Sequence, residues 1–371
     1  MVYTSHATPE GTDTYQKRFS GKLAPGHFRL HQGCWLSSIG LGTYLGHHDI
    51  TTDTLYRDAI IRALELGCNV IDTAINYRCQ RSERVIGQAL SLLFKEGRLK
   101  REEVLIATKG GFIPFDGEPP RNPRAYILET FVKPGIITFE DIVADCHCLA
   151  PRYIQNQLDR SLKNLGLGCV DIYYLHNPET QLSEVSREEF YRRMKAAFQV
   201  LEENVIRGKI QWYGTATWDG YRTSPQAPDY LSLQDLVELA REVGGETHHF
   251  KVIQLPYNLA MAEAFTHQNQ AVGEEVLSVF EAAQRLGITV MTSASIYQSR
   301  LARNLPPTIY GFFPGVFTDA QRAIQFVRST PGVTTALVGM KQRAHVEENL
   351  KTALTPPMSQ EEFMRLFSQA P

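Results

Sequence analysis

Short apolar runs and longer amphipathic stretches alternate along the chain from about residue 36. The short runs are rich in β-branched and aromatic residues, as strands are, whereas the longer stretches repeat apolar residues at helical spacing. The pattern predicts strands over residues 39–43, 69–73, 104–109, 170–176, 210–215, 252–255, 288–292 and 334–339. It predicts helices over residues 52–66, 82–95, 152–165, 187–206, 232–243, 273–286, 318–329 and 343–352.

Eight strands that alternate with eight helices favour a closed parallel barrel, the (β/α)8 TIM barrel, over an open sheet. An open dinucleotide-binding sheet would carry a G-x-G-x-x-G run directly after a strand, and no such run follows any predicted strand. Local signals mark several helix ends. Thr51 and Thr52 are expected to cap the first helix, which Gly67 ends, and Gly166 and Gly208 end two others.

The 371 residues are interpreted as one domain, residues 1–371, because no low-complexity linker interrupts the alternation. The barrel core is expected over residues 36–352. The N-terminal extension, residues 1–35, is expected to close the bottom of the barrel with a hairpin or to be partly disordered. After Pro356 and Pro357 the tail, residues 356–371, is expected to form one more surface helix.

One connection is much longer than a βα loop usually is: residues 110–151, between the third strand and the third helix. It follows a strand, so it belongs to the carboxyl face of the barrel, where barrel active sites are built. Two interpretations remain open. The insertion is either a lid over the substrate mouth, with Gly110, Gly111 and Gly135 as hinges, or a packed mini-domain that serves stability or dimerisation.

Composition narrows the classes of function. The net charge of −2 indicates no general affinity for nucleic acid or acidic membranes, and no apolar run approaches the ~20 residues that span a bilayer. Without a signal-like N-terminus, a cytoplasmic protein is expected. The six cysteines are scattered and do not suggest a disulfide framework. Cys146, His147 and Cys148 cluster, but a zinc site usually needs spaced pairs of ligands, so no metal is expected.

Ionisable residues end three successive strands: Asp72, Lys109 and His176. In a parallel barrel these side chains gather at one rim, and Tyr77 lies early in the loop after Asp72. A phenol with a pKa of ~10 is a poor acid near neutrality. An adjacent ammonium is expected to lower that pKa, the carboxylate to hold the ammonium, and the imidazole to orient a carbonyl oxygen. Together they predict a general acid for carbonyl reduction beside a hydride donor.

The chain resembles the aldo-keto reductases over nearly all of residues 36–352. Order and spacing together make the resemblance specific. The matching residues are Ile39 to Thr43, Asn69 to Ala74 with Tyr77, Ser82 and Glu83 with Ile86 and Gly87, Thr108 and Lys109, Val170 to His176, Gly208 to Ile210, Gln254 with Tyr257 and Asn258, and Gly339 followed by Glu347 to Asn349. The resemblance implies that Tyr77 is the proton donor, with Asp72, Lys109 and His176 completing a tetrad.

The resemblance also implies an NADP(H) cofactor that lies extended across the top of the barrel. Lys341 and Arg343 are expected to pair with its 2′-phosphate through charge-assisted hydrogen bonds, and Glu348 and Asn349 to contact its adenine. The residues expected to bind the cofactor are Gly42, Thr43, Thr217, Gln254, Ser293, Gly339, Lys341, Arg343, His345, Glu348 and Asn349.

Around the nicotinamide the sequence departs from the family pattern. Ala216 and Thr217 stand where a Ser-Asn pair normally holds the carboxamide, although Gln254 is present. Ser293 stands where an aromatic residue usually stacks on the ring. One partner of the carboxamide and the stacking surface of the ring are therefore altered.

The sequence therefore predicts an NADP(H)-dependent oxidoreductase that interconverts a small carbonyl compound (an aldehyde, ketone or sugar) and an alcohol. Phe112, Trp218 and Tyr297 are expected to bind the substrate. A nucleotide-binding regulatory subunit with little turnover is the alternative, and an isomerase or lyase on the same scaffold is a third. Partners other than the small molecule, such as nucleic acid or membrane, are not expected, and the oligomeric state is left open.

Overall fold

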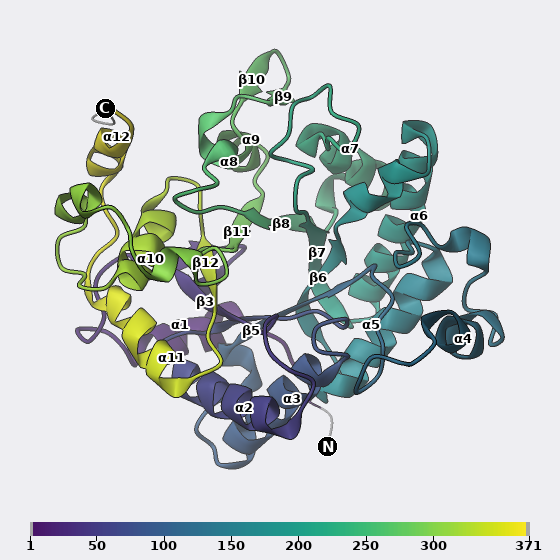
Figure 1. Ribbon diagram of the computed structural model, residues 1–371, viewed down its shortest axis with the longest axis horizontal. Helices are drawn as coiled ribbons and strands as arrows, with labels where there is room; N and C mark the ends of the chain where they lie inside the picture. The colour runs from purple at the N-terminus through teal and green to yellow at the C-terminus, as the bar shows by residue number, and fades with distance from the viewer. Residues whose placement is uncertain (1–2, 369–371) are drawn as a thin grey trace.

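A computed structural model describes residues 3–368 of the chain (Figure 1). Parallel strands close into a barrel in the order β11-β12-β3-β4-β5-β6-β7-β8, which confirms the predicted (β/α)8 fold. The barrel strands are β3 (Ile39–Gly42), β4 (Val70–Asp72), β5 (Leu105–Gly110), β6 (Val170–His176), β7 (Ile210–Ala216), β8 (Phe250–Pro256), β11 (Thr289–Ser293) and β12 (Thr335–Gly339). The ends of each strand lie within two residues of the predicted ends.

Helices surround the barrel and cover the outer face of its strands (Figure 1). The main ones are α2 (Ile50–Glu65), α3 (Arg81–Lys95), α5 (Pro151–Leu165), α6 (Arg187–Ile206), α7 (Leu233–Gly244), α9 (Val279–Arg285), α10 (Asp319–Ser329) and α11 (Arg343–Leu350). Their apolar faces pack on the strands because each helix carries its buried residues along one side. The shorter elements are α1 (Pro9–Lys17), β1 (Phe28–His31), β2 (Cys34–Ser37), α4 (Pro123–Ile127), α8 (Glu263–Thr266), β9 (Gln270–Val272), β10 (Glu275–Leu277) and α12 (Gln360–Ser368).

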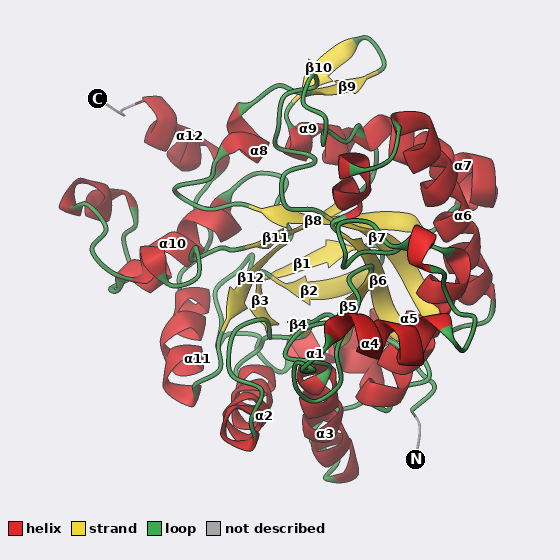
Figure 2. Ribbon diagram, turned by 45° about the vertical axis from the view of Figure 1, so that its right-hand side comes forward, coloured by secondary structure: helices red, strands yellow, loops and turns green. Residues whose placement is uncertain are grey.

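The N-terminal extension closes one end of the barrel, as expected. Its strands β1 and β2 form an antiparallel hairpin, and Figure 2 shows the pair within the ring of barrel strands. Cys34 and Leu36 of β2 are buried in one apolar cluster with the barrel residues Val70, Leu105 and Ile172. The hairpin is therefore the apolar floor of the barrel interior.

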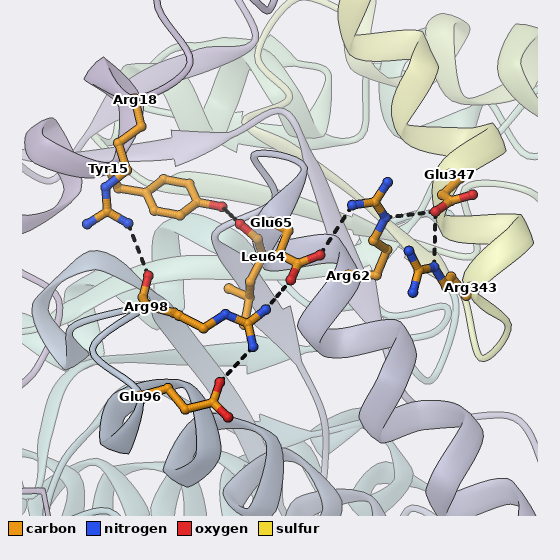
Figure 3. Close-up of polar contacts among 9 residues, drawn as sticks. All are labelled: Tyr15, Arg18, Arg62, Leu64, Glu65, Glu96, Arg98, Arg343 and Glu347. Carbon is orange, nitrogen blue, oxygen red and sulfur yellow. Dashed lines mark hydrogen bonds and ion pairs between the residues drawn. The ribbon is translucent and has the colours of Figure 1, made fainter.

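Helix α1 fastens this extension to the rest of the molecule. The Tyr15 hydroxyl donates to the backbone carbonyl of Leu64 at the end of α2, as Figure 3 shows. Arg18 donates to the carbonyl of Arg98 and pairs with the buried carboxylate of Glu103. Residues 1 and 2, which belong to the extension expected to form a hairpin or to be partly disordered, lie outside the described part of the chain.

One predicted helix is partly wrong. Residues 273–278 were expected to open the helix over 273–286, but β9 and β10 pair as a hairpin across Gly273, which has φ +61°. Helix α9 begins only at Val279. Ser278 caps it, because its hydroxyl accepts from the Glu281 amide while the Glu281 carboxylate accepts from the Ser278 amide.

Helix boundaries elsewhere follow local capping. Asp49 caps α2 by accepting from the Thr52 amide at 2.7 Å, so the expected caps Thr51 and Thr52 lie inside the helix instead. The glycine predictions are confirmed: Gly166 is the left-handed C-cap of α5, at φ +67°. The tail forms α12 up to Ser368, and the rest of the predicted helix lies outside the described residues.

The insertion folds beside α5, outside the ring of strands (Figure 1). It contains α4, followed by a π-helical turn at Leu128–Val132 and a 3-10 turn at Phe139–Asp141. Phe131 is fully buried, with its ring 5.7 Å from that of Tyr153 and the Arg160 guanidinium 4.9 Å from its centre. This buried packing favours the mini-domain interpretation of the insertion.

The two glycines expected as a hinge are close-packed instead. A Cβ on Gly110 would lie 2.1 Å from the Tyr173 hydroxyl oxygen, and one on Gly111 would lie 2.8 Å from Nε2 of His147. Gly111 also has φ +142°, which side chains rarely adopt. Close packing therefore accounts for glycine at both positions, and their role as hinges stays a prediction. Among the described residues no helix is both long and apolar enough to cross a membrane.

Buried histidines predict how stability depends on pH. Burial lowers the pKa of His27 to about 3, and those of His147 and His248 to about 4. As pH falls below 6.5 the unfolded chain takes up protons on these residues and the folded chain does not, so their contribution, present above 6.5, is lost progressively. His27 alone should lower the free energy of unfolding by about 2 kcal/mol between pH 7 and 5.

Urea titrations at pH 7 and 5 measure this difference. His27→Gln should make the loss between the two pH values smaller by about that amount, whereas the exposed His345→Gln is the matched control and should leave it unchanged. An equal pH dependence in the wild type and His27→Gln would contradict the prediction.

Candidate active site

A cavity of about 480 Å³ opens at the carboxyl ends of the barrel strands, a volume typical of a small-molecule site. Most of the residues predicted from the sequence line it: Gly42, Thr43, Asp72, Tyr77, Phe112, His176, Thr217, Trp218, Gln254, Ser293 and Gly339. Lys109 lies directly behind this wall, where it contacts Asp72 and Tyr77.

A buried ion pair forms the base of the cavity. Nζ of Lys109, which has no exposed surface, donates to Oδ2 of Asp72 at 2.6 Å, to the carbonyl of Thr73 at 2.8 Å and to the hydroxyl of Tyr77 at 3.4 Å. These three acceptors match the three N–H bonds of an ammonium. The other oxygen of Asp72 accepts from Nε2 of Gln254 at 2.8 Å, so strands β4, β5 and β8 jointly hold the pair.

Burial sets the protonation states here. It raises the pKa of Tyr77 well above its ordinary 10, and the charges of Asp72 and Tyr44 add to the rise. The net shift is therefore opposite to the lowering expected from the Lys109 ammonium, because burial dominates. Burial also lowers the pKa of Lys109, which Asp72 opposes. Tyr77 is a protonated phenol at neutral pH, and a proton is ready for donation.

His176 lies beside Tyr77, with ring centres 5.8 Å apart and planes at 75°. Burial, Lys109 and His147 all lower its pKa well below 6.5, so the imidazole is neutral. Its Nδ1 is buried without a hydrogen-bond partner among residues 3–368. A neutral imidazole beside a phenol can orient a carbonyl oxygen toward the phenol proton.

Aromatic side chains form the walls. The Tyr44 ring lies 5.0 Å from that of Tyr77, and the Phe112 ring lies 5.0 Å from that of His176. Trp218 lines the cavity and stays partly exposed. The structure thus brings Phe112 and Trp218 to the same cavity as the predicted tetrad.

The family model described as Aldo/keto reductase family matches residues 38–240, more than half of the chain. The chain belongs to the aldo/keto reductase family. It is 30% identical over 192 residues to the NADH-specific methylglyoxal reductase of Escherichia coli, covering 50% of this chain and 49% of that protein. It is 28% identical over 204 residues to a putative voltage-gated potassium channel subunit beta of Schizosaccharomyces pombe, covering 55% and 48%.

The chain thus spans about half the length of the curated relatives it matches. The fold is shared along nearly the whole chain with an aldo/keto reductase of Klebsiella pneumoniae solved with NADP and acetate. The TM-score is 0.62 at 19% identity, covering 93% of this chain and 95% of that one. The likeness at this identity concerns the fold.

Gly42, Gly339, Thr217 and Ser293 were expected to bind the cofactor. Gly42 and Gly339 are paired neighbours on β3 and β12, and nothing lies within 4 Å of a Cβ built on Gly339. Thr217 lines the cavity, and its Oγ1 is buried without a partner in the described part of the chain. Ser293 ends β11 at the same rim. Open space and an unpaired hydroxyl therefore mark this side of the cavity.

The residues expected near the adenosine end lie outside the cavity, on or just before α11. Arg343 pairs with Glu347 at 3.1 Å, and Glu347 pairs in turn with Arg62 of α2 at 2.8 Å (Figure 3). His345 is exposed, whereas Asn349 is buried. Lys341 and Glu348, the remaining two, are half-buried.

Tyr297, expected to bind substrate, does not line the cavity. Tyr297, Gln298 and Ser299 all have positive φ, from 45° to 72°, which makes a tight left-handed turn. The turn brings Gln298 and Ser299 to the cavity, while the Tyr297 ring lies 5.0 Å from the Arg300 guanidinium. That turn contains no glycine, so the sequence carried no signal for it.

Several lining residues were missed by sequence reasoning. They share a position directly after a barrel strand, which was the available signal: Tyr44, Leu45, Asn76, Asn177, Ala294, Ser295 and Ile296. Glu179 was also missed. Its carboxylate accepts from the Trp218 amide at 2.6 Å and the Asp219 amide at 3.3 Å, which fixes the loop carrying Trp218.

The ion pair yields a stability prediction. Lys109→Met leaves the Asp72 carboxylate buried without its cation, which should lower the free energy of unfolding by about 3–5 kcal/mol. The double variant Asp72→Asn/Lys109→Met removes both charges and should recover most of that loss. Urea unfolding of the wild type, the single variant and the double variant measures it. A single variant less than about 1 kcal/mol below the wild type would contradict the coupling.

Proposed function

We propose that this protein is an NADP(H)-dependent oxidoreductase that interconverts a small carbonyl compound and an alcohol, with Tyr77 as general acid and base. The observation that carries the proposal is the Lys109–Asp72 pair beneath the Tyr77 hydroxyl. Tyr77, unlike Lys109, reaches the cavity. The site therefore offers a phenol proton to a reacting carbonyl, and the buried ammonium of Lys109 holds the phenol oxygen in place.

Each residue has a separate role in reduction. Tyr77 donates its proton to the carbonyl oxygen, which becomes the alcohol hydroxyl, and the ammonium of Lys109 stabilises the phenolate that remains. Asp72 and Gln254 hold that ammonium in place. His176, neutral, orients the carbonyl oxygen toward Tyr77. A bound reduced nicotinamide supplies the hydride that the carbonyl carbon receives. In oxidation the same proton returns to Tyr77.

The cavity suits a nicotinamide nucleotide. The unpaired hydroxyl of Thr217 fits a carboxamide partner, and the space beside Gly339 is open, two residues before Lys341 in the chain. Gln254 stays available as a lining residue although its Nε2 serves Asp72. The Klebsiella neighbour binds NADP, but the Escherichia relative is NADH-specific by name. The preference for NADP(H) rests here on Lys341 and Arg343.

A nucleotide-binding regulatory subunit is the competing function, since one relative is named as a channel subunit. The assembled tetrad favours the enzyme, because a subunit that only binds nucleotide has no need of a proton donor beneath its cavity. Turnover separates the two functions: NADPH binding without loss of its absorbance in the presence of aldehydes would support the subunit.

Tyr77→Phe tests the catalytic role. The variant lacks the donated proton but keeps the ring, so carbonyl reduction should fall by about 10²–10⁴-fold while the Kd for NADPH stays nearly unchanged. Steady-state reduction of aldehydes and fluorescence titration with NADPH measure the two quantities. Tyr44→Phe is a matched control on the neighbouring ring and should retain most activity. Near-full activity in Tyr77→Phe would mean that another group donates the proton.

Cofactor choice is tested at α11. Lys341→Ala/Arg343→Ala should erode a preference for NADPH over NADH by a few kcal/mol at most, because two charge-assisted contacts are lost. Glu347→Gln removes the carboxylate that competes for Arg343, so it should not weaken NADPH binding. The Kd values of the wild type and both variants for NADPH and for NADH measure this preference. Equal affinity of the wild type for the two cofactors would contradict this prediction.

A further inference from the structure

His147 belongs to the Cys146–Cys148 cluster that stood out in the sequence, and the oxidoreductase mechanism does not use it. It lies at the neck of the insertion, where the outgoing and returning chains pair. The Ile113 amide donates to the Cys146 carbonyl at 2.7 Å, and the Cys148 amide donates to the Gly111 carbonyl at 2.9 Å. His147 lies on the returning chain of this neck and is completely buried. Within residues 3–368 no group of three potential ligands surrounds a metal site.

The His147 ring ends on the backbone of His176. Its Nε2 lies 2.7 Å from the His176 carbonyl oxygen, at the last residue of β6. Beyond this point the neighbouring chain has left the ladder, because β5 ends at Gly110 and Gly111 turns away at φ +142°. A buried carbonyl at such a strand end needs a donor from outside the sheet. His147 supplies it.

Two further residues fix the direction of this hydrogen bond. Arg193 can only donate, so the Gln181 oxygen that lies 2.7 Å from it is the acceptor. The amide nitrogen of Gln181 therefore faces Nδ1 of His147, at 2.8 Å, and donates to it. Nδ1 has no proton, so the proton of the neutral ring lies on Nε2 and points at His176. Burial lowers the pKa of His147 to about 4, which keeps this tautomer neutral.

Packing holds the same two histidines from the side. The Phe112 ring meets His147 edge to face at 5.0 Å and 82°, and His176 at 5.0 Å and 89°. A Cβ on Gly111 would lie 2.9 Å from the His176 carbonyl oxygen and 2.8 Å from Nε2 of His147, so only glycine leaves room for their contact. His147, Phe112 and His176 thus form one packed row from the insertion to the cavity.

We propose that His147 is a positioning residue, through which the insertion fixes the end of β6 and thereby the imidazole of His176 in the active site. The proposal rests on the proposed function, in which His176 orients the reacting oxygen. The insertion then contributes to catalysis through its contact with the end of β6. A purely structural neck would stabilise the fold but would leave the orientation of His176 unchanged.

Four variants separate these roles. His147→Leu keeps bulk and removes the donor, so kcat should fall about 10- to 100-fold, the usual cost of a small misplacement, while the Kd for NADPH changes less than about twofold. His147→Gln places an amide N–H near the lost Nε2 and should restore most of kcat. Gln181→Met leaves His147 without its orienting partner, so its kcat should lie between those of His147→Leu and the wild type. Cys146→Ala, an exposed neighbour in the same neck, is the matched control and should equal the wild type.

A second measurement does not depend on turnover. Long-range ¹H–¹⁵N spectra of the imidazoles should show a protonated Nε2 and an unprotonated Nδ1 for His147 from pH 5 to 8. The ring nitrogens of His176 should shift in His147→Leu and stay in place in Cys146→Ala. If the wild type binds NADPH without turnover, the proposed function fails, and these spectra still decide whether His147 positions His176.

Two results would overturn the proposal. One is a folded His147→Leu protein with wild-type kcat and unmoved His176 resonances. The other is a loss of melting temperature and of kcat that His147→Gln does not reverse, with the His176 resonances again unmoved, because a structural neck alone would produce it.

Discussion

A lysine ammonium without any exposed surface can exist inside a barrel only if acceptors surround it on every side. Here Asp72, Thr73 and Tyr77 meet that requirement, and they come from β4 and the loop after it. Gln254 reaches the same carboxylate from β8, on the other side of the closed sheet. The complete set of contacts around the ion pair therefore exists only when the barrel is closed. Desolvation, which makes the pair costly, also keeps Tyr77 protonated and His176 neutral.

Around this centre, hydrogen bonds from buried polar side chains fix the backbone of the loops that follow the strands. Glu179 holds the loop after β7 through backbone amides, and burial raises its pKa to about 7. His147 holds the end of β6, and Ser82 donates to the carbonyl of Thr43 after β3. Each contact joins segments far apart in the chain. The rim is thus preorganised by contacts between neighbouring loops, as the proposed alignment of a proton donor requires.

The parts that local chemistry dictates were predictable from sequence. Strand β6 lies where its apolar run predicts, and Asp72, Lys109 and His176 meet because parallel strands all end at one rim. What failed depends on tertiary context. The β9–β10 hairpin replaces the start of a helix, and the turn at Tyr297 uses left-handed residues without glycine. The direction of the Tyr77 pKa follows from burial, which no spacing of residues reveals.

The floor of the barrel has a consequence for how the chain acquires its structure. Arg29 of β1 donates to the carbonyl of Thr334, and the Thr335 hydroxyl donates to the carbonyl of Ser37 in β2, so the first hairpin is joined to the last barrel strand. A hairpin made early in synthesis thus has its full docking surface only after β12 has been made. The apolar side of the hairpin therefore stays exposed while some three hundred further residues are synthesised. We therefore expect the barrel to close and the β1–β2 hairpin to dock in the same late step of folding. Contacts of such long range in sequence are typical of slow-folding topologies.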